Sequence, residues 1–187
     1  MRLTEIALVG GILAILTLAH FIADWVFQSH DEAMRKATEP KIRARHCLVY
    51  TGIMSFVLVF GLHLSALEIG VYASILFLSH FVEDSYLPVY LWAKYIRNAP
   101  EFTIGGEVSE LDRFREFAST PLGKILVIVV DQVIHIIFLA IIAAMMLVHG
   151  TKDFWLLYFA ALGVIGLFAL LSWRAKPALS PVQNEPS

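Results

Sequence analysis

Cysteine is almost absent from this sequence, and its scarcity excludes two kinds of site. Only Cys47 is present, so no internal disulfide can form and cysteine alone cannot build a thiolate metal site. Charged residues are also scarce, at 16% of the chain against about 25% in soluble domains. The net charge of −2 gives no indication of a nucleic-acid partner. These shortages point away from a disulfide-stabilised fold, a soluble domain and a nucleic-acid-binding protein.

The chain is instead rich in long apolar stretches. Hydrophobic residues make up 58% of the sequence, and the mean hydropathy is +0.72. Stretches of roughly 20 apolar residues can cross a bilayer core. We predict five such spans, at residues 6–27, 46–64, 67–92, 125–148 and 154–173. The expected fold is an all-α polytopic membrane bundle forming one domain over residues 1–176, with a disordered Pro- and Ser-rich tail at 177–187.

Basic residues predict the orientation of this bundle. The first span ends in HFIADWVFQ rather than in a small-x-small cleavage pattern, so we expect it to be retained as a membrane helix. Two residues, Arg2 and Lys152, lie on the side where the first span begins. The other twelve lie on the opposite side: Arg35, Lys36, Lys41, Arg43, Arg45, Lys94, Arg97, Arg113, Arg115, Lys124, Arg174 and Lys176. The positive-inside rule then predicts an external N-terminus and a cytoplasmic C-terminus.

Three pairs of histidine and aspartate, each four residues apart, lie inside these apolar spans. They are His20 with Asp24, His80 with Asp84, and Asp131 with His135. Positions i and i+4 share one face of a helix, so both side chains of each pair point the same way. Random placement of seven His and six Asp in 187 residues would give about 0.45 such pairs. Ionisable groups in a membrane span are costly, which favours a functional site.

The topology places all three pairs at a similar depth in the cytoplasmic half. Gln28 follows the first pair, His46 opens the second span, and Gln132 lies beside the third pair. His63 and His149 lie at the other side and are excluded from the site. We therefore expect four helices to direct one polar set to one level.

These residue types are suited to a divalent metal. The predicted ligands are His20, Asp24, His80, Asp84, Asp131 and His135. A sulfur-free set of N and O ligands suits zinc or manganese, and six side chains are enough for one or two ions. The spans that carry these ligands contain no Lys or Arg at that level, so a metal would supply the missing positive charge. His46 is the candidate general acid or base, with Gln28 and Gln132 orienting substrate or water.

The same polar residues would also serve three roles that involve no catalysis. Intramembrane polar side chains often act as interhelical hydrogen bonds. They can also form an ion or solute pathway, although the odd number of spans and the absence of a visible inverted repeat do not favour a transporter. A non-catalytic membrane partner protein with a structural polar site is the third alternative.

The cytoplasmic loop at residues 93–124 contains an amphipathic pattern. Leu111, Phe114 and Phe117 would share one helix face, and Ser109 with Asp112 resembles a helix start. The pattern predicts an interfacial helix, acting either as a lid over the site or as a surface connector.

The sequence contains the motifs HFIADWVFQ, HFVED and DQVIH, and a His opens the second span. Together these features resemble a family of small bacterial and phage membrane proteins, domain of unknown function three-three-zero-seven. This resemblance implies a location in the inner membrane of a bacterium. The family itself resembles membrane-bound metal-dependent hydrolases. That resemblance implies hydrolysis of an ester or phosphoester. At this depth, membrane lipid or a lipid-like substrate would reach the site from the cytoplasmic leaflet.

Overall fold

The computed structural model describes residues 3–96 and 110–179 of the chain. The described residues contain helices and connecting turns, and no strand is found among them. The helices are α1 (Leu3–Phe21), η1 (Ile22–Val26), α2 (His30–Arg35), α3 (Pro40–Phe60), α4 (Ala66–Glu83), α5 (Leu87–Leu91), η2 (Trp92–Ile96), α7 (Glu110–Ser119), α8 (Pro121–Leu147) and α9 (Lys152–Leu179). The predicted all-α class is confirmed.

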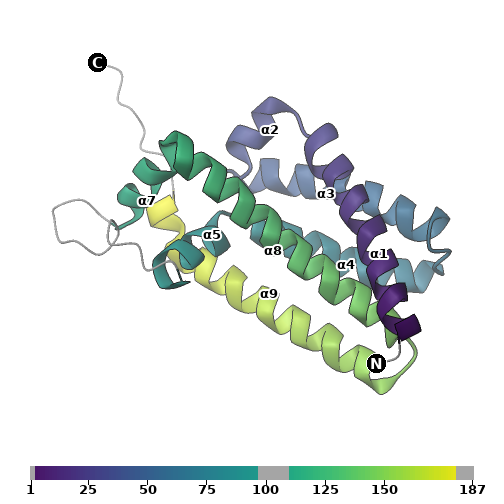
Figure 1. The fold of residues 1–187 in the computed structure, drawn as a ribbon. Coiled ribbons are helices and arrows are strands. Elements are labelled where there is room, and N and C mark those ends of the chain that lie inside the picture. The colour runs from purple at the N-terminus through teal and green to yellow at the C-terminus, as the bar shows by residue number, and fades with distance from the viewer. Residues whose placement is uncertain (1–2, 97–109, 180–187) are drawn as a thin grey trace, which may run out of the picture.

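Five helices are long and apolar enough to cross a membrane, as predicted. These segments are Leu3–Val26, Pro40–Phe60, Ala66–Glu83, Pro121–Leu147 and Lys152–Leu171. The start of α1 and the end of α9 lie at opposite ends of the bundle, as an odd number of crossings requires (Figure 1). The length and apolar character of these helices indicate a membrane protein.

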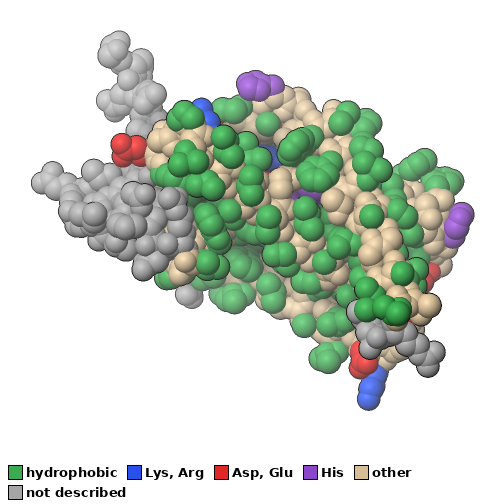
Figure 2. Space-filling view, in the orientation of Figure 1, with side chains coloured by type: hydrophobic (Ala, Val, Ile, Leu, Met, Phe, Trp, Pro, Cys, Tyr) green, Lys and Arg blue, Asp and Glu red, His purple; other side chains and the backbone are tan. Residues whose placement is uncertain are grey.

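The outer surface of the bundle is apolar. Leu18, Phe56 and Leu156 are each more than half exposed, and they belong to three different spanning helices. Hydrophobic side chains cover most of the face shown in Figure 2, with most of the visible charged side chains toward its edges. Such a surface is unsuited to water and is suited to contact with lipid.

The interior is held together by apolar side chains from every spanning helix. Leu16, Met54, Ile75, Ile142 and Ile165 come from α1, α3, α4, α8 and α9 and share one buried cluster. Helix α3 packs mainly on α4, and α1 packs mainly on α8. In lipid, close packing of this kind is a main source of helix association. It fixes the rotation of the four helices that carry the polar residues.

Two differences between the predicted and observed helix limits concern the polar residues. Helix α3 begins at Pro40, so His46 lies in its second turn rather than at its start. Helix α4 ends at Glu83, whereas the predicted third span continues to residue 92. Tyr86 has a φ of 59°, in the left-handed region, and the separate helix α5 begins at Leu87, with Pro88 in its first turn. A left-handed residue with a proline two positions later cannot continue an α-helix, so the chain changes direction here.

The loop at residues 93–124, where an amphipathic helix was predicted, contains α7. Phe114 is buried against Val89, Ala93 and Val127, so α7 covers α5, η2 and the start of α8. The predicted helix-start residue Ser109 lies outside the described residues. Helix α9 extends to Leu179, past the predicted start of the tail at residue 177.

Candidate metal centre

The first polar pair is separated by a change of helix type. His20 lies in the last turn of α1, and Asp24 lies in the π-helical turn η1 that follows. A π-turn contains more residues than an α-turn, so it changes the direction in which Asp24 points; such turns are frequent at functional sites. His20 contacts the Tyr50 hydroxyl through Nδ1 at 3.2 Å and Gln132 Oε1 through Nε2 at 3.0 Å. Asp24 instead meets His46.

Four buried side chains direct one ligand atom each toward a common point. They are Asp24, His46, His80 and Asp84, supplied by η1, α3 and the end of α4. Asp24 Oδ1 lies 3.0 Å from His46 Nε2 and 3.6 Å from His80 Nε2. Asp84 Oδ2 lies 3.5 Å from the same His46 atom and 3.4 Å from the same His80 atom. The two imidazole Nε2 atoms are 3.0 Å apart.

These separations fit a tetrahedral metal site. Ligand atoms about 2.0–2.1 Å from a tetrahedral zinc lie about 3.3 Å from one another. The five distances within the group run from 3.0 to 3.6 Å and bracket that value. We refer to Asp24, His46, His80 and Asp84 as the ligand group. Two histidines and two aspartates provide the N and O donors that zinc and manganese accept.

Lys36 reaches this group from the segment after α2, which sequence reasoning did not anticipate. Its Nζ lies 3.0 Å from Asp24 Oδ1 and 2.9 Å from Asp84 Oδ1. It also lies 3.4 Å from His46 Nε2. The expectation that only a metal could supply positive charge here was therefore wrong. Burial disfavours the charged ammonium, but Asp84 and Asp24 outweigh burial and raise the pKa of Lys36, so it stays protonated.

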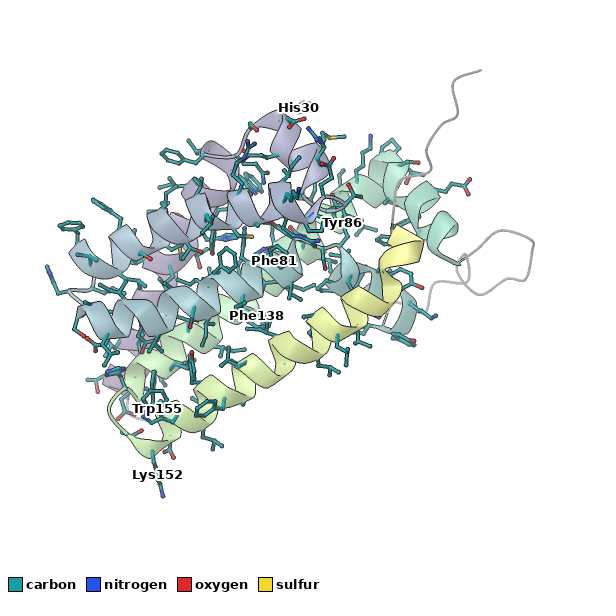
Figure 3. All side chains as sticks on the ribbon, turned by 180° about the vertical axis from the view of Figure 1, so that it is seen from behind. His30, Phe81, Tyr86, Phe138, Lys152 and Trp155 are labelled. Carbon is teal, nitrogen blue, oxygen red and sulfur yellow. The ribbon has the colours of Figure 1, made fainter. Side chains whose placement is uncertain are left out.

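A capping box holds α2 and therefore positions Lys36. The Ser29 hydroxyl accepts from the Glu32 backbone N–H, and the Glu32 carboxylate accepts from the Ser29 backbone N–H at 3.0 Å. The hydrogen bond from the Ser29 backbone N–H is the largest cause, and it lowers the pKa of Glu32. Burial opposes this shift, whereas the Ser29 hydroxyl and Arg45 add to it. Arg45 Nε donates to Glu32 at 3.0 Å and joins α2 to α3. His30 begins α2 and is exposed (Figure 3).

A second set of possible ligands adjoins the first. His135 Nε2 lies 3.2 Å from Glu83 Oε2 and 3.9 Å from Asp84 Oδ1. Its Nδ1 lies 2.8 Å from the backbone oxygen of Asp131 and 3.8 Å from that residue's carboxylate. Two further groups of three could hold a metal here: His80 with Glu83 and His135, and Asp84 with Asp131 and His135. Glu83 was not among the predicted ligands.

The remaining predicted site residues surround these ligands. Gln28 Nε2 lies 3.3 Å from the His46 ring nitrogens. Gln132 Nε2 donates to Asp131 at 3.2 Å and approaches Asp24 at 3.4 Å. His20 belongs to none of the three groups found among the described residues, because Tyr50 and Gln132 occupy its ring nitrogens. It lies beside the ligand group, with its ring centre 6.0 Å from that of His80.

Tyr50 is a further residue that sequence reasoning missed. It is buried, and its ring stacks on the His80 imidazole with centroids 3.7 Å apart and planes 3° from parallel. Together with its contact to His20, this stacking fixes the orientation of two histidines at once. Orienting partners of this kind are typical of metal sites.

Several buried polar atoms of the site have no hydrogen-bond partner among the described residues. Among the described residues, these atoms form no hydrogen bond of acceptable geometry: His80 Nδ1, Glu83 Oε1, both Asp84 carboxylate oxygens and His135 Nε2. Buried polar groups are normally paired, and unpaired ones are costly. Two of these atoms have charged neighbours, since Asp84 Oδ1 lies 2.9 Å from Lys36 Nζ and His135 Nε2 lies 3.2 Å from Glu83 Oε2. The buried His and Asp groups could hold a metal ion, which would pair further atoms.

Arg43 is a second buried cation, near the start of α3. Its guanidinium lies 4.7 Å above the centre of the Phe81 ring, and its Nε and Nη1 have no hydrogen-bond partner among the described residues. A buried guanidinium with free donors is suited to bind an oxyanion.

A comparison with models of protein families assigns the chain to one family. The model of a family described as a protein of unknown function, DUF3307, matches residues 12–162. The chain belongs to this family. The matched range contains every residue of the ligand group, together with Lys36, Glu83, Asp131 and His135. The chain matches none of the curated proteins and none of the solved structures.

DUF3307 is a family of unknown function, so membership assigns no reaction to this chain. The match begins within α1 and ends within α9, so it includes part or all of each of the five spanning helices. For this DUF3307 protein, the buried His and Asp groups could hold a metal ion. The reaction performed there has to be argued from those residues.

Proposed function

We propose that this protein is a membrane-embedded, metal-dependent hydrolase that cleaves an ester or phosphoester of an amphiphilic substrate at the cytoplasmic leaflet. The observation that carries the proposal is the ligand group, whose Nε2 and Oδ atoms have separations close to a tetrahedral edge. The apolar surface around it supports a substrate that arrives through lipid.

Charge balance supports a divalent cation even though Lys36 is present. Asp24, Glu83, Asp84 and Asp131 carry −4 when ionised, and Lys36 contributes +1, which leaves −3. One divalent ion brings the sum to −1, and two bring it to +1. An uncompensated charge is strongly unfavourable in a low-dielectric interior. Either occupancy removes most of the imbalance, with zinc or manganese suited to these donors.

The side chains divide naturally into three roles. His46 belongs with the ligands, because its Nε2 is 3.0 Å from both Asp24 Oδ1 and His80 Nε2; this revises its predicted role as general acid or base. An ion held by the ligand group would supply Lewis-acid chemistry. Glu83, with one oxygen free of partners, is suited to accept a proton. Lys36 and Arg43 are suited to hold a negatively charged phosphoester.

Turnover of simple probes tests the proposal. Purified protein in nanodiscs would be given p-nitrophenyl palmitate and bis-p-nitrophenyl phosphate, with zinc, with manganese or with a chelator. We expect metal-dependent release of nitrophenol from at least one probe, lost in Asp84→Asn and kept in His149→Ala. Release that ignores the metal, or that both variants retain equally, would contradict a hydrolase using this group.

The leaflet assignment depends on topology. A reporter fused after Ser187 should report the cytoplasm, and one inserted at Gly150 should report the outside, as the distribution of basic residues predicts. The reverse pattern would move the ligand group, and the substrate with it, to the external leaflet.

One observation favours a different function, a structural polar site. Lys36 already bridges Asp24 and Asp84, and such an ion pair can hold α2 against the bundle without any metal. A structural site predicts protein that folds and remains stable without metal and hydrolyses neither probe. A transporter using the same residues would instead carry divalent ions into proteoliposomes.

A further inference from the structure

An apolar cavity adjoins the candidate metal centre on the side facing α9. It encloses about 460 Å³, within the range of ligand pockets, and is partly open to the outside. Its walls come from α4, α5, η2, α8 and α9, including Trp92, Ile137, Phe138 and Phe168. In Figure 3, Phe138 is seen between α4 and α9. The cavity therefore lies among membrane-spanning helices, where the surrounding solvent is hydrocarbon.

The break after α4 explains why the cavity exists. Had α4 continued as a straight helix to residue 92, as the apolar run predicts, its next turns would lie beside α8 and α9. The left-handed residue Tyr86 ends that course, and α5 and η2 form the outer wall instead. The same break follows directly after Glu83 and Asp84. Site and cavity thus share one structural origin.

Among the residues that line the cavity, Glu83 is the one with a buried side-chain atom that lacks a hydrogen-bond partner. Of its lining residues, Ser79 donates its hydroxyl hydrogen to the Leu76 carbonyl oxygen at 3.4 Å, within its own helix. Glu83 is 3% exposed; its Oε2 lies 3.2 Å from His135 Nε2, and its Oε1 has no hydrogen-bond partner among the described residues. Glu83 therefore belongs to the cavity wall and also to a possible metal-binding group with His80.

We propose that this cavity binds the hydrocarbon chain of the substrate, and that the polar group next to the chain donates a hydrogen bond to Glu83. The inference rests on the proposed function and specifies its substrate class: a long-chain amphiphile with a hydroxyl or similar donor beside the chain. The chain replaces lipid or empty space along the apolar walls. The donor satisfies the free Glu83 oxygen and brings the adjoining bond toward the ligand group.

Photolabelling with a defined probe tests this inference. The probe is a long-chain alcohol with a diazirine in its chain, compared with its methyl ether, which has no donor. Protein in nanodiscs would be irradiated, and the label on Ile165 measured by mass spectrometry. Ile165 lines the cavity and is only 4% exposed, so lipid around the bundle labels it poorly. We expect the alcohol to label it more than the ether.

Two tryptophan substitutions on α8 provide a matched pair. Ile137 lines the cavity and is 53% exposed, whereas Ile128 is 52% exposed and does not line it. Ile137→Trp should reduce labelling of Ile165 about tenfold by filling the cavity, and Ile128→Trp should leave it unchanged. Glu83→Leu should abolish the preference for alcohol over ether. Both surface variants should retain wild-type metal content.

The outcomes separate this inference from the proposed function. Equal labelling of Ile165 in both tryptophan variants would overturn the chain-binding cavity, as would protection of the cavity by a second copy of the protein cross-linked over it. Wild-type protein that contains no metal but shows the expected labelling would overturn the hydrolase proposal and leave the cavity assignment intact.

Discussion

The bundle carries histidine and carboxylate side chains at both ends, and the two ends differ in how completely these are paired. At one end, His149 Nδ1 lies 3.3 Å from the Tyr72 hydroxyl, and its Nε2 lies 2.9 Å from Glu68 Oε1. Both ring nitrogens are used, and the pair is partly open to solvent. At the other end, the buried Nδ1 of His80 has no hydrogen-bond partner among the described residues, and His135 Nε2 meets Glu83 Oε2 at 3.2 Å while Glu83 Oε1 has no hydrogen-bond partner there.

This difference separates a structural polar contact from a site prepared for a ligand. The His149 pair connects the start of α4 to the turn after α8 and needs nothing more. The ligand group lies at the end of α4, with its donor atoms clustered and several left unpaired. Unpaired buried polar groups cost stability unless a ligand satisfies them. The following substitutions either break the contrast or sharpen it.

The largest effect is expected at Lys36. Lys36→Met removes the one cation paired with Asp24 and Asp84, so metal-free protein should lose about 3–5 kcal/mol of unfolding free energy. Divalent metal should restore most of this loss by supplying charge to the same carboxylates. SDS-induced unfolding in mixed micelles, with and without zinc, would measure both effects. Lys152→Met, at the other end, is the matched control and should be nearly neutral.

A smaller effect is expected from the side chains around the ligands. Gln132→Ala removes the contacts of Gln132 with His20, Asp24 and Asp131, so metal affinity should fall about 10–100-fold with the fold retained. Competition with a fluorescent zinc chelator would measure the affinity. Tyr158→Phe, which breaks only the 3.1 Å contact with Ser74, should leave it unchanged. An unaltered affinity in Gln132→Ala would show that this residue does not orient the ligands.

The smallest effect compares the two capping boxes. Ser29→Ala at α2 and Ser65→Ala at α4 each remove an N-cap, and each should cost about 1 kcal/mol. Only Ser29→Ala should disturb the site, because α2 carries Lys36 to Asp24 and Asp84. Hydrogen exchange of the α2 amides, measured with metal affinity, would detect the difference. Equal effects of both variants on affinity would separate α2 from the site.

The convergence of the polar pairs was predictable from the sequence, since helical spacing and alternating span direction together determine depth. Asp24, His80, Asp84, Asp131 and His135 do meet as expected. His20 lies outside these groups, because the π-turn after Phe21 makes Asp24 point in a different direction from His20. No simple spacing rule predicts such a turn.

Lys36 and Glu83 escaped prediction for different reasons. Lys36 follows a short helix outside the spans, and only tertiary packing brings its long side chain to Asp84. The S-x-x-E pattern of Ser29 and Glu32 could have indicated that helix. Glu83 lies outside the four-residue spacing, although it precedes Asp84 directly. The proline at position 88 was a readable signal that the third span ends early.

Metal content is the most direct test of the central claim, that the ligand group is a metal site and the His149 pair is not. Wild-type protein, His80→Ala and His149→Ala would be purified in detergent, without added chelator, and analysed for first-row metals by mass spectrometry. We predict at least one equivalent of a divalent metal, probed as zinc and manganese, in the wild type and in His149→Ala. His80→Ala should contain almost no metal, and SDS-induced unfolding would check that this variant is folded. Equal metal content in the two variants, or metal-free wild type that cannot be loaded, would contradict the account.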